Sequence, residues 1–283
     1  MRGRNFMGLP HRSRIADMNK NWIHQQTERN ISQFDKAMET SNPESRAYLY
    51  DAKEYLSRIS EQCNYLDAVK LVDWELWLKK GCAVLDLGCG GGWLTGYLSR
   101  LEAVSTVYAL DSSKYFVLDM LPQIVRLMGG RQEKIVPIEG LFTPLMFDDG
   151  ALDLVVASSV LHHADSLESV LKEMKRVLRS DGLLVILNET PSSGIRHVLS
   201  LGKAFIKIVL NAAFHRYKPI SPSISSSGYL YDPRLGDRDY PLWYWKEAIH
   251  RSGFVIVECI DTGLATVKNV KGRSLVHFVC RAA

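Results

Sequence analysis

The fold is decided by the stretch Val84–Leu98, which reads VLDLGCGGGWLTGYL. The apolar residues on either side of Asp86 do not alternate with polar ones, which is typical of a strand buried on both faces. Four glycines follow within five positions, and apolar residues then recur at helical spacing from Trp93. A strand, a glycine turn and a helix start predict a ligand site made of backbone N–H groups and the helix dipole.

Strand and helix patterns alternate on the carboxyl-terminal side of this stretch. We expect strands at 83–87, 105–110, 134–138, 152–157 and 183–187, and helices at 93–101, after Asp111 to about 128, and at 167–178. A helix at 242–251 and two strands at 254–260 and 275–280, joined without a helix, end the chain. This order predicts an α/β fold: a seven-stranded, mostly parallel Rossmann-like sheet with helices on both faces and an antiparallel final strand.

The stretch Asp86-Leu87-Gly88-Cys89-Gly90-Gly91-Gly92 resembles the first motif of the class I S-adenosylmethionine (SAM) methyltransferases. The dinucleotide fingerprint G-x-G-x-x-G is the alternative, but it would require a glycine at position 93, where the chain has tryptophan. Two further segments are similar to the branch of the family that methylates quinones and small molecules. They are Leu152-Asp153-Leu154-Val155 and the run Ser158-Ser159-Val160-Leu161-His162-His163 that follows it.

The resemblance implies that SAM is the cofactor and S-adenosylhomocysteine (SAH) the product. Asp111 ends the second predicted strand, where a carboxylate can accept hydrogen bonds from both ribose hydroxyls. Many relatives have a Gly-Asp pair after the third strand, whereas this chain has Gly140-Leu141, so the adenine contacts stay open. The predicted cofactor-binding residues are Asp86, Gly88, Cys89, Gly90, Asp111, Ser112, Leu141, Phe142 and Ser158.

The chemistry implied by the family is an in-line displacement at the sulfonium methyl, for which the protein supplies mainly proximity and alignment. A hydroxyl nucleophile would also need a base with a pKa near neutrality. We name His163 as the first catalytic candidate and His162 as the second; a purely structural role for the pair is the alternative. No metal site is expected, because adjacent histidines do not share a helix face.

The sequence predicts four regions. Residues 1–18 form a disordered basic arm, 19–80 a helical cap, 81–190 with 241–283 the SAM-binding core, and 191–240 an inserted lid. In the cap, one helix should begin at Ser41 and a second should span about 65–80. The inserted lid contains a polar stripe along one helix: Arg196, Ser200, Lys203, Lys207 and Asn211. Docking of that helix on the core is the preferred interpretation. A wall for a hydrophobic substrate and membrane contact through 195–214 are the alternatives.

The composition of the chain limits the classes of partner and the cellular compartment that we expect for it. The 283 residues carry a formal net charge of only +4, which argues against a nucleic-acid substrate. Five scattered cysteines, without a CxxC pair, indicate reduced thiols in a cytoplasmic protein, and neither a secretory leader nor a membrane-spanning run is predicted.

We therefore expect a SAM-dependent methyltransferase that acts on the O, N or C atom of a small organic acceptor. Two alternatives remain: a non-catalytic scaffold with this fold, which Leu141 keeps open, and a nicotinamide-dependent oxidoreductase, which Trp93 disfavours. The oligomeric state is open.

Overall fold

A seven-stranded sheet forms the centre of the protein in the computed structural model, which describes residues 49–213, 223–225, 228–232 and 236–283. Its strands are β1 (Cys82–Leu87), β2 (Val104–Asp111), β3 (Ile135–Glu139), β4 (Leu152–Ser158), β5 (Leu178–Glu189), β9 (Phe254–Ala265) and β10 (Ser274–Ala282). They lie in the order β3-β2-β1-β4-β5-β10-β9. β1 to β5 pair in parallel, and β10 is antiparallel to both β5 and β9. The predicted fold class is confirmed.

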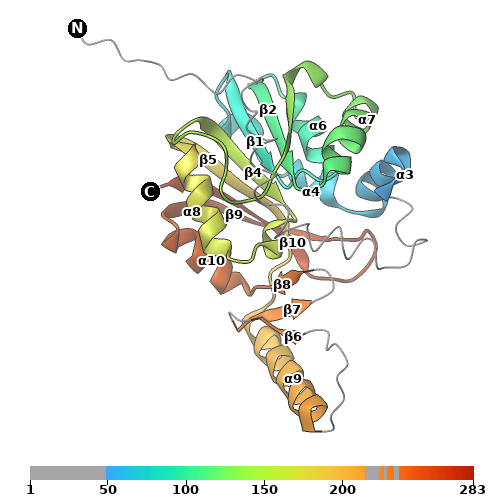
Figure 1. The fold of residues 1–283 in the computed structure, drawn as a ribbon, viewed down its shortest axis with the longest axis vertical. Helices are drawn as coiled ribbons and strands as arrows, with labels where there is room; N and C mark the ends of the chain where they lie inside the picture. The colour runs from blue at the N-terminus through green and yellow to red at the C-terminus, as the bar shows by residue number, and fades with distance from the viewer. Residues whose placement is uncertain (1–48, 214–222, 226–227, 233–235) are drawn as a thin grey trace.

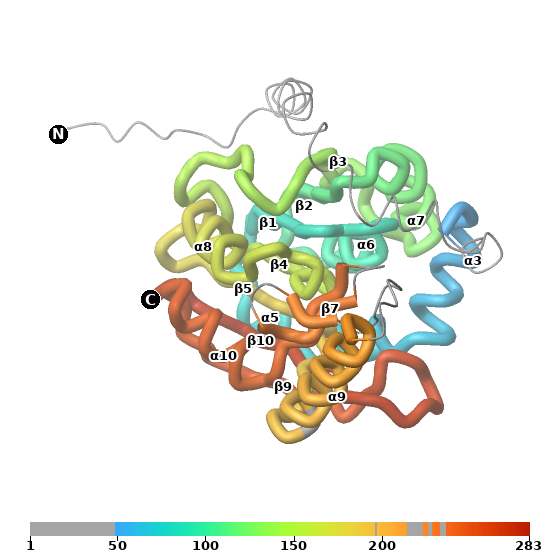
Figure 2. The backbone as a smooth tube through the Cα atoms, turned by 60° about the horizontal axis from the view of Figure 1, so that its bottom comes forward, coloured from blue at the N-terminus to red at the C-terminus, as the bar shows by residue number. Residues whose placement is uncertain are grey.

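Helices cover both faces of the sheet (Figures 1 and 2). On one face lie α8 (Leu167–Val177) and α10 (Leu242–Arg251). On the other lie α6 (Trp93–Ser99), α7 (Leu121–Leu127) with the preceding turn η3 (Phe116–Met120), and the N-terminal helix α3 (Ala52–Ser57). Successive residues of β1 contact opposite layers, with Leu85 and Leu87 against the first and Val84 against the second. The double burial explains why β1 is apolar throughout except for Asp86.

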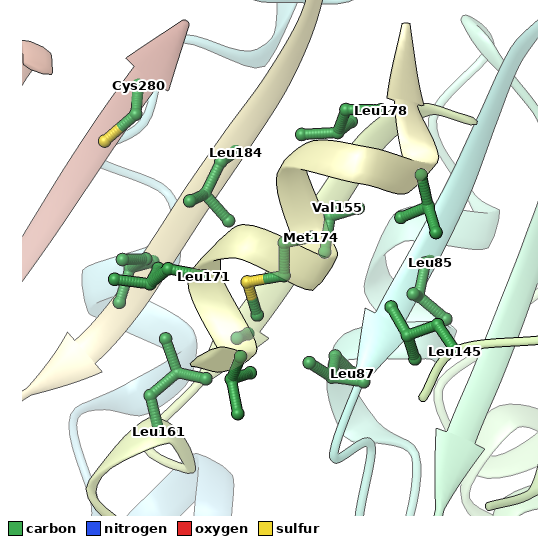
Figure 3. Packing of buried hydrophobic residues seen from close by; sticks show 14 of the residues in the cluster. Leu85, Leu87, Leu145, Val155, Leu161, Leu171, Met174, Leu178, Leu184 and Cys280 are labelled. Atoms are coloured by element: carbon green, nitrogen blue, oxygen red, sulfur yellow. The ribbon is translucent and has the colours of Figure 1, made fainter. Parts of the chain in front are cut away.

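The packing of α8 shows how the sequence pattern becomes a core. Its apolar residues recur at i, i+3, i+4 and i+7, and Ser166 caps the helix by accepting a hydrogen bond from the Ser169 N–H. Leu171 and Met174 point into a layer that also contains Leu87 of β1 and Leu184 of β5 (Figure 3). The helix begins at Leu167, as predicted, because the capping residue and the first residue of the apolar stripe indicate the same start.

The N-terminal helices differ from the prediction. The expected start at Ser41 and the arm 1–18 lie outside the described residues. Within them, α3 begins at Ala52, because the Asp51 carboxylate accepts the N–H groups of Lys53 and Glu54. A single helix over 65–80 was wrong: two short helices replace it, α4 (Tyr65–Val69) and α5 (Trp74–Trp77).

The break between α4 and α5 has a local cause. Asp73 caps the second helix by accepting the Leu76 N–H, and the indole of Trp74 donates to the Val69 carbonyl. These two bonds satisfy backbone groups that a continuous helix would have paired internally. The chain therefore turns between Val69 and Asp73 instead of continuing the helix.

The segment between β5 and α10 adds a 20-residue helix and a small sheet. The helix is α9 (Gly194–Ala213), and the three-stranded sheet consists of β6 (Ser223–Ile224), β7 (Leu230–Asp232) and β8 (Asp237–Asp239). α9 contacts β6 and β7 and projects away from the central sheet (Figure 1). Within the described residues, no helix is both long and apolar enough to cross a bilayer.

Candidate active site

The glycine turn joins the carboxyl ends of β1 and β2. The N–H of Gly90 donates to Oδ2 of Asp111 over 2.9 Å, and the N–H groups of Gly88 and Cys89 donate to the Leu110 carbonyl. The other oxygen of Asp111, Oδ1, accepts the Ser113 N–H at 2.9 Å. A carboxylate has about four acceptor positions, so Asp111 can accept further hydroxyl groups while it holds the loop. The structure thus brings Gly88, Gly90 and Asp111 together.

The glycines of this loop are required for different reasons. A Cβ on Gly88 would lie 2.4 Å from a methyl group of Val160, and one on Gly92 would lie 2.1 Å from Leu121. Both positions have a positive φ, +72° at Gly88 and +90° at Gly92, and neighbouring side chains also pack onto their backbone, so both favour glycine. Gly90 has a φ of +52°, and among the described residues a Cβ there would lie within 4 Å of a single atom, the hydroxyl of Tyr55 at 3.3 Å. The backbone is therefore open to a ligand at Gly90.

Asp86 lies behind the loop. Its carboxylate is only 1% exposed and accepts the hydroxyl of Thr95 over 2.6 Å. Burial raises the pKa of Asp86 to about 7, and the nearby charge of Asp111 also raises it, whereas the Thr95 bond lowers it. The predicted role of Asp86 in cofactor binding stays a prediction, since this carboxylate is bonded to α6.

The raised pKa of Asp86 predicts a pH-dependent stability. Near pH 5 the folded protein holds a proton on Asp86 that the unfolded chain, with its ordinary pKa of 3.8, has released. The free energy of unfolding should therefore fall as pH rises towards 7, by about 1.4 kcal/mol per unit where one proton is exchanged, and level off above it. In Asp86→Asn this fall should disappear.

Urea unfolding of both proteins at pH 5, 6, 7 and 8 measures the difference. Asp119→Asn is the matched control, because Asp119 is an exposed carboxylate on the neighbouring turn. Parallel pH profiles for wild type and Asp86→Asn would show that Asp86 is ionised in the folded protein.

The remaining predicted cofactor residues surround the same edge of the sheet. The carbonyl of Asp111 accepts the N–H of Gly140, which ties the ends of β2 and β3 together. Leu141, Phe142 and Ser112 follow these two strand ends and are all half-buried. Ser158 ends β4, and its hydroxyl accepts a hydrogen bond from the amide of Asn188. Cys89 is buried within the loop, where burial raises the pKa of its thiol.

A buried glutamate organises the turn after β4. Glu189, at the end of β5, is 1% exposed and accepts the N–H groups of Val160 and Leu161 through Oε1, at 3.1 and 3.0 Å. Its Oε2 lies 2.8 Å from Nδ1 of His162. Burial lowers the pKa of His162, but the charge and hydrogen bond of Glu189 outweigh burial, so the pKa lies above the ordinary value. This bond directs Nε2, the other ring nitrogen, away from the carboxylate.

His163 has a different carboxylate partner. Its Nδ1 lies 3.0 Å from Oδ1 of Asp237 on β8, and the two histidine rings are 4.3 Å apart. Burial raises the pKa of Asp237. The hydrogen bond and charge of His163, together with the charge of His162, lower it by more, so the pKa lies below its ordinary value. Within the described residues, His162, His163 and Asp237 each place one donor atom within 4.8 Å of the others. Two imidazoles and a carboxylate can also hold a transition-metal ion, so the expected absence of a metal stays a prediction.

A cavity of about 340 Å³ opens beside His162. Its walls include His162 and Glu189 from the core, Ser200 from α9, Asp237 and Arg238 from β8, and Arg273, the residue before β10. Its size and its mixture of charged and aromatic walls suit a small polar organic molecule. The turn after β4 links the cavity to the glycine loop, because Val160 packs on Gly88 while His162 lines the cavity.

Glu189 and Tyr55 are among the site residues that the sequence analysis did not select. Glu189 was not selected, although an acidic residue at the end of an apolar parallel strand is a recognisable pattern. The hydroxyl of Tyr55 accepts the N–H of Gly91 over 3.2 Å. No local pattern predicts that contact, because the two residues are 36 positions apart.

Comparisons with known proteins find methyltransferases. The family described as methyltransferase domain matches residues 85–186. Malonyl-[acyl-carrier protein] O-methyltransferase from Legionella pneumophila is 30% identical over 50% of this chain and 44% of its own length. Ubiquinone biosynthesis O-methyltransferase from Xanthomonas oryzae pv. oryzae is 25% identical over 55% of this chain and 63% of its own length. The chain thus spans about half the length of these curated relatives.

A solved structure shares the fold over most of the chain. Burkholderia thailandensis 1,6-didemethyltoxoflavin-N1-methyltransferase superposes with a TM-score of 0.54 at 15% identity, over 86% of this chain and 91% of that chain. The family match shows that residues 85–186 correspond to a methyltransferase domain, and the sheet order agrees with the fold of that solved structure. The residues present fit SAM, because the open backbone at Gly90 lies next to the half-buried carboxylate of Asp111.

Proposed function

We propose that the protein transfers the methyl group of SAM to a small organic acceptor held in the cavity beside His162. The observation that carries this proposal is the turn after β4, which packs Val160 on the glycine loop and presents His162 to the cavity. A cofactor on the loop and an acceptor in the cavity would be brought together by one short segment. Proximity of this kind is the main contribution of a protein to such a displacement.

The chain's own residues can prepare the acceptor for attack. Bound SAM supplies an electrophilic methyl group on a sulfonium. Glu189 fixes the proton of His162 on Nδ1, so Nε2 is left as an acceptor that can take a proton from a hydroxyl or amine in the cavity. Asp237 can orient His163 in the same manner. Arg238 and Arg273 line the same cavity and can bind an anionic group of the acceptor.

Calorimetric titration of the purified protein with SAH tests the cofactor, with NADH as the control ligand. We expect micromolar binding of SAH and none of NADH. A second step incubates the protein with methyl-labelled SAM and a panel of phenols, catechols, amines and carboxylic acids. Release of SAH that depends on one acceptor class supports the proposal. Absence of SAH binding would favour the scaffold alternative.

The two histidines should be separable by substitution. Because His162 lines the cavity and is held by the buried Glu189, His162→Ala should lower kcat by about 10²- to 10⁴-fold. If His163 is the base, as the sequence first indicated, His163→Ala should show that loss instead. SAH affinity should stay near wild type in both variants.

Activity of wild type in EDTA, and after addition of Zn²⁺, decides whether the cluster of His162, His163 and Asp237 acts with a metal. Unchanged turnover in EDTA supports a histidine that acts as a general base without a metal ion. If both alanine variants turn over at the wild-type rate, the histidine pair is structural and proton transfer by these side chains is wrong.

We further propose that the protein works in the reducing cytoplasm. Five unpaired cysteines, four of them buried, support this location.

A further inference from the structure

The exposed surface of α9 is unusual for a protein surface. Seven large apolar residues of this helix are between 48% and 79% exposed: Ile195, Val198, Leu199, Phe205, Ile206, Val209 and Leu210. Such a concentration on one helix marks an interaction surface, whereas scattered single apolar residues do not. We call these seven residues the outer face of α9.

The opposite side of α9 is already occupied by the protein. His197 and Ala204, seven residues apart, are buried at 4% and 1% exposure. His197 Nδ1 lies 3.1 Å from the hydroxyl of Ser192, and its ring lies 5.8 Å from that of Tyr229. Half-buried Ser200 of the same side lines the cavity. At about 100° per residue, the outer face therefore points directly away from the small sheet.

The charged side chains of α9 are all positive. Residues 194–213 contain Arg196, Lys203 and Lys207 and no aspartate or glutamate. Lys203 and Lys207 are exposed and, four residues apart, form one ridge at the margin of the outer face. A cationic helix with an apolar face and a margin of lysines is typical of helices that lie in the interface of an anionic bilayer. A second copy of α9 would bring these lysines towards like charges.

We infer that α9 docks on the surface of an anionic lipid bilayer, with its outer face among the acyl chains and its lysines at the phosphates. The helix lies along the surface and does not cross it, in agreement with its limited hydropathy. Ser200 lies on the opposite side of α9 and lines the cavity, so docking would leave one helix diameter, about 10 Å, between the bilayer surface and this wall of the cavity. The inference concerns the helix surface alone and does not depend on methyl transfer.

Sedimentation with lipid vesicles tests the inference on the full chain. Wild type should sediment with phosphatidylglycerol-containing vesicles at least ten times more strongly than with pure phosphatidylcholine, and high salt should weaken the binding. Phe205→Glu/Ile206→Glu should reduce binding at least tenfold. Lys203→Glu/Lys207→Glu should reduce it on the order of 30-fold or more on the anionic vesicles.

Matched controls separate the surface from general effects of charge. Leu118→Glu changes an apolar residue that is 52% exposed on the distant turn η3, and Lys53→Glu/Lys271→Glu reverses two exposed lysines outside α9. Both controls should sediment like wild type. All variants should melt as wild type and bind SAH as wild type does, so failure of docking is distinguishable from failure of the proposed methyl transfer.

Three results would overturn the inference. The first is equal sedimentation of wild type with anionic and neutral vesicles. The second is wild-type sedimentation of both α9 variants. The third is a dimer in light scattering that Phe205→Glu/Ile206→Glu converts to a monomer, since a second copy of the chain would then cover the outer face.

Discussion

Asp111→Ala is expected to weaken SAH binding by about 100-fold. Asp111 accepts the Gly90 N–H through one oxygen and the Ser113 N–H through the other, and it retains acceptor capacity for ribose hydroxyls. Removing the carboxylate therefore loosens the glycine loop and deletes charged acceptors for the ligand. Each hydrogen bond to a charged group contributes about 1.5–3 kcal/mol, so the loss of one or two of them accounts for a 100-fold change, about 2.7 kcal/mol.

Calorimetry with SAH measures the effect, and Asp119→Ala, an exposed carboxylate on the neighbouring turn, is the control. Asp111→Asn is a useful intermediate, because the amide keeps one oxygen for a backbone N–H but offers a donor to the other. It should bind SAH more weakly than wild type and more tightly than Asp111→Ala. Wild-type affinity in Asp111→Ala, in a protein that melts normally, would remove Asp111 from the cofactor site.

The parts of the molecule that the sequence predicted are those in which local patterns agree with the final packing. The parallel strands are buried on both faces, so their apolar runs are visible, and α8 has both a cap and an apolar stripe. Asp111 was recognisable because the end of a strand beside a glycine turn fixes the direction of its side chain. Each of these features depends on residues close together in the chain.

The features that the sequence did not predict depend on contacts between segments far apart in the chain. Asp237 lies beside His163 only because the β6–β8 sheet folds back over the end of β4, and 74 positions separate the two residues. The glycines illustrate a subtler limit, because the sequence predicted a turn and ligand access for the cluster and selected Gly88 and Gly90 for cofactor binding. The structure explains Gly88 and Gly92 by the packing of Val160 and Leu121. Composition alone cannot distinguish an open backbone from a tightly packed one.

Glu189→Gln is expected to abolish most turnover while the fold and SAH affinity are retained. The glutamine oxygen can still accept the N–H groups of Val160 and Leu161, which the wild-type Oε1 accepts at 3.1 and 3.0 Å. Its amide nitrogen, however, would face Nδ1 of His162, where a donor forces that nitrogen to become an acceptor. The proton then moves to Nε2, which can no longer take a proton from the acceptor, and kcat should fall about 10²- to 10⁴-fold.

Glu189→Ala separates this tautomer effect from stability. It leaves two buried N–H groups without their acceptor, so it should lower the free energy of unfolding by about 2–4 kcal/mol, whereas Glu189→Gln should cost clearly less. The tautomer itself is observable without any acceptor, because ¹⁵N chemical shifts of the His162 ring distinguish a proton on Nδ1 from one on Nε2. We expect Nδ1–H in wild type and Nε2–H in Glu189→Gln. The same ring protonation in both proteins, together with unchanged turnover, would show that Glu189 holds the turn after β4 but does not prepare His162 for catalysis.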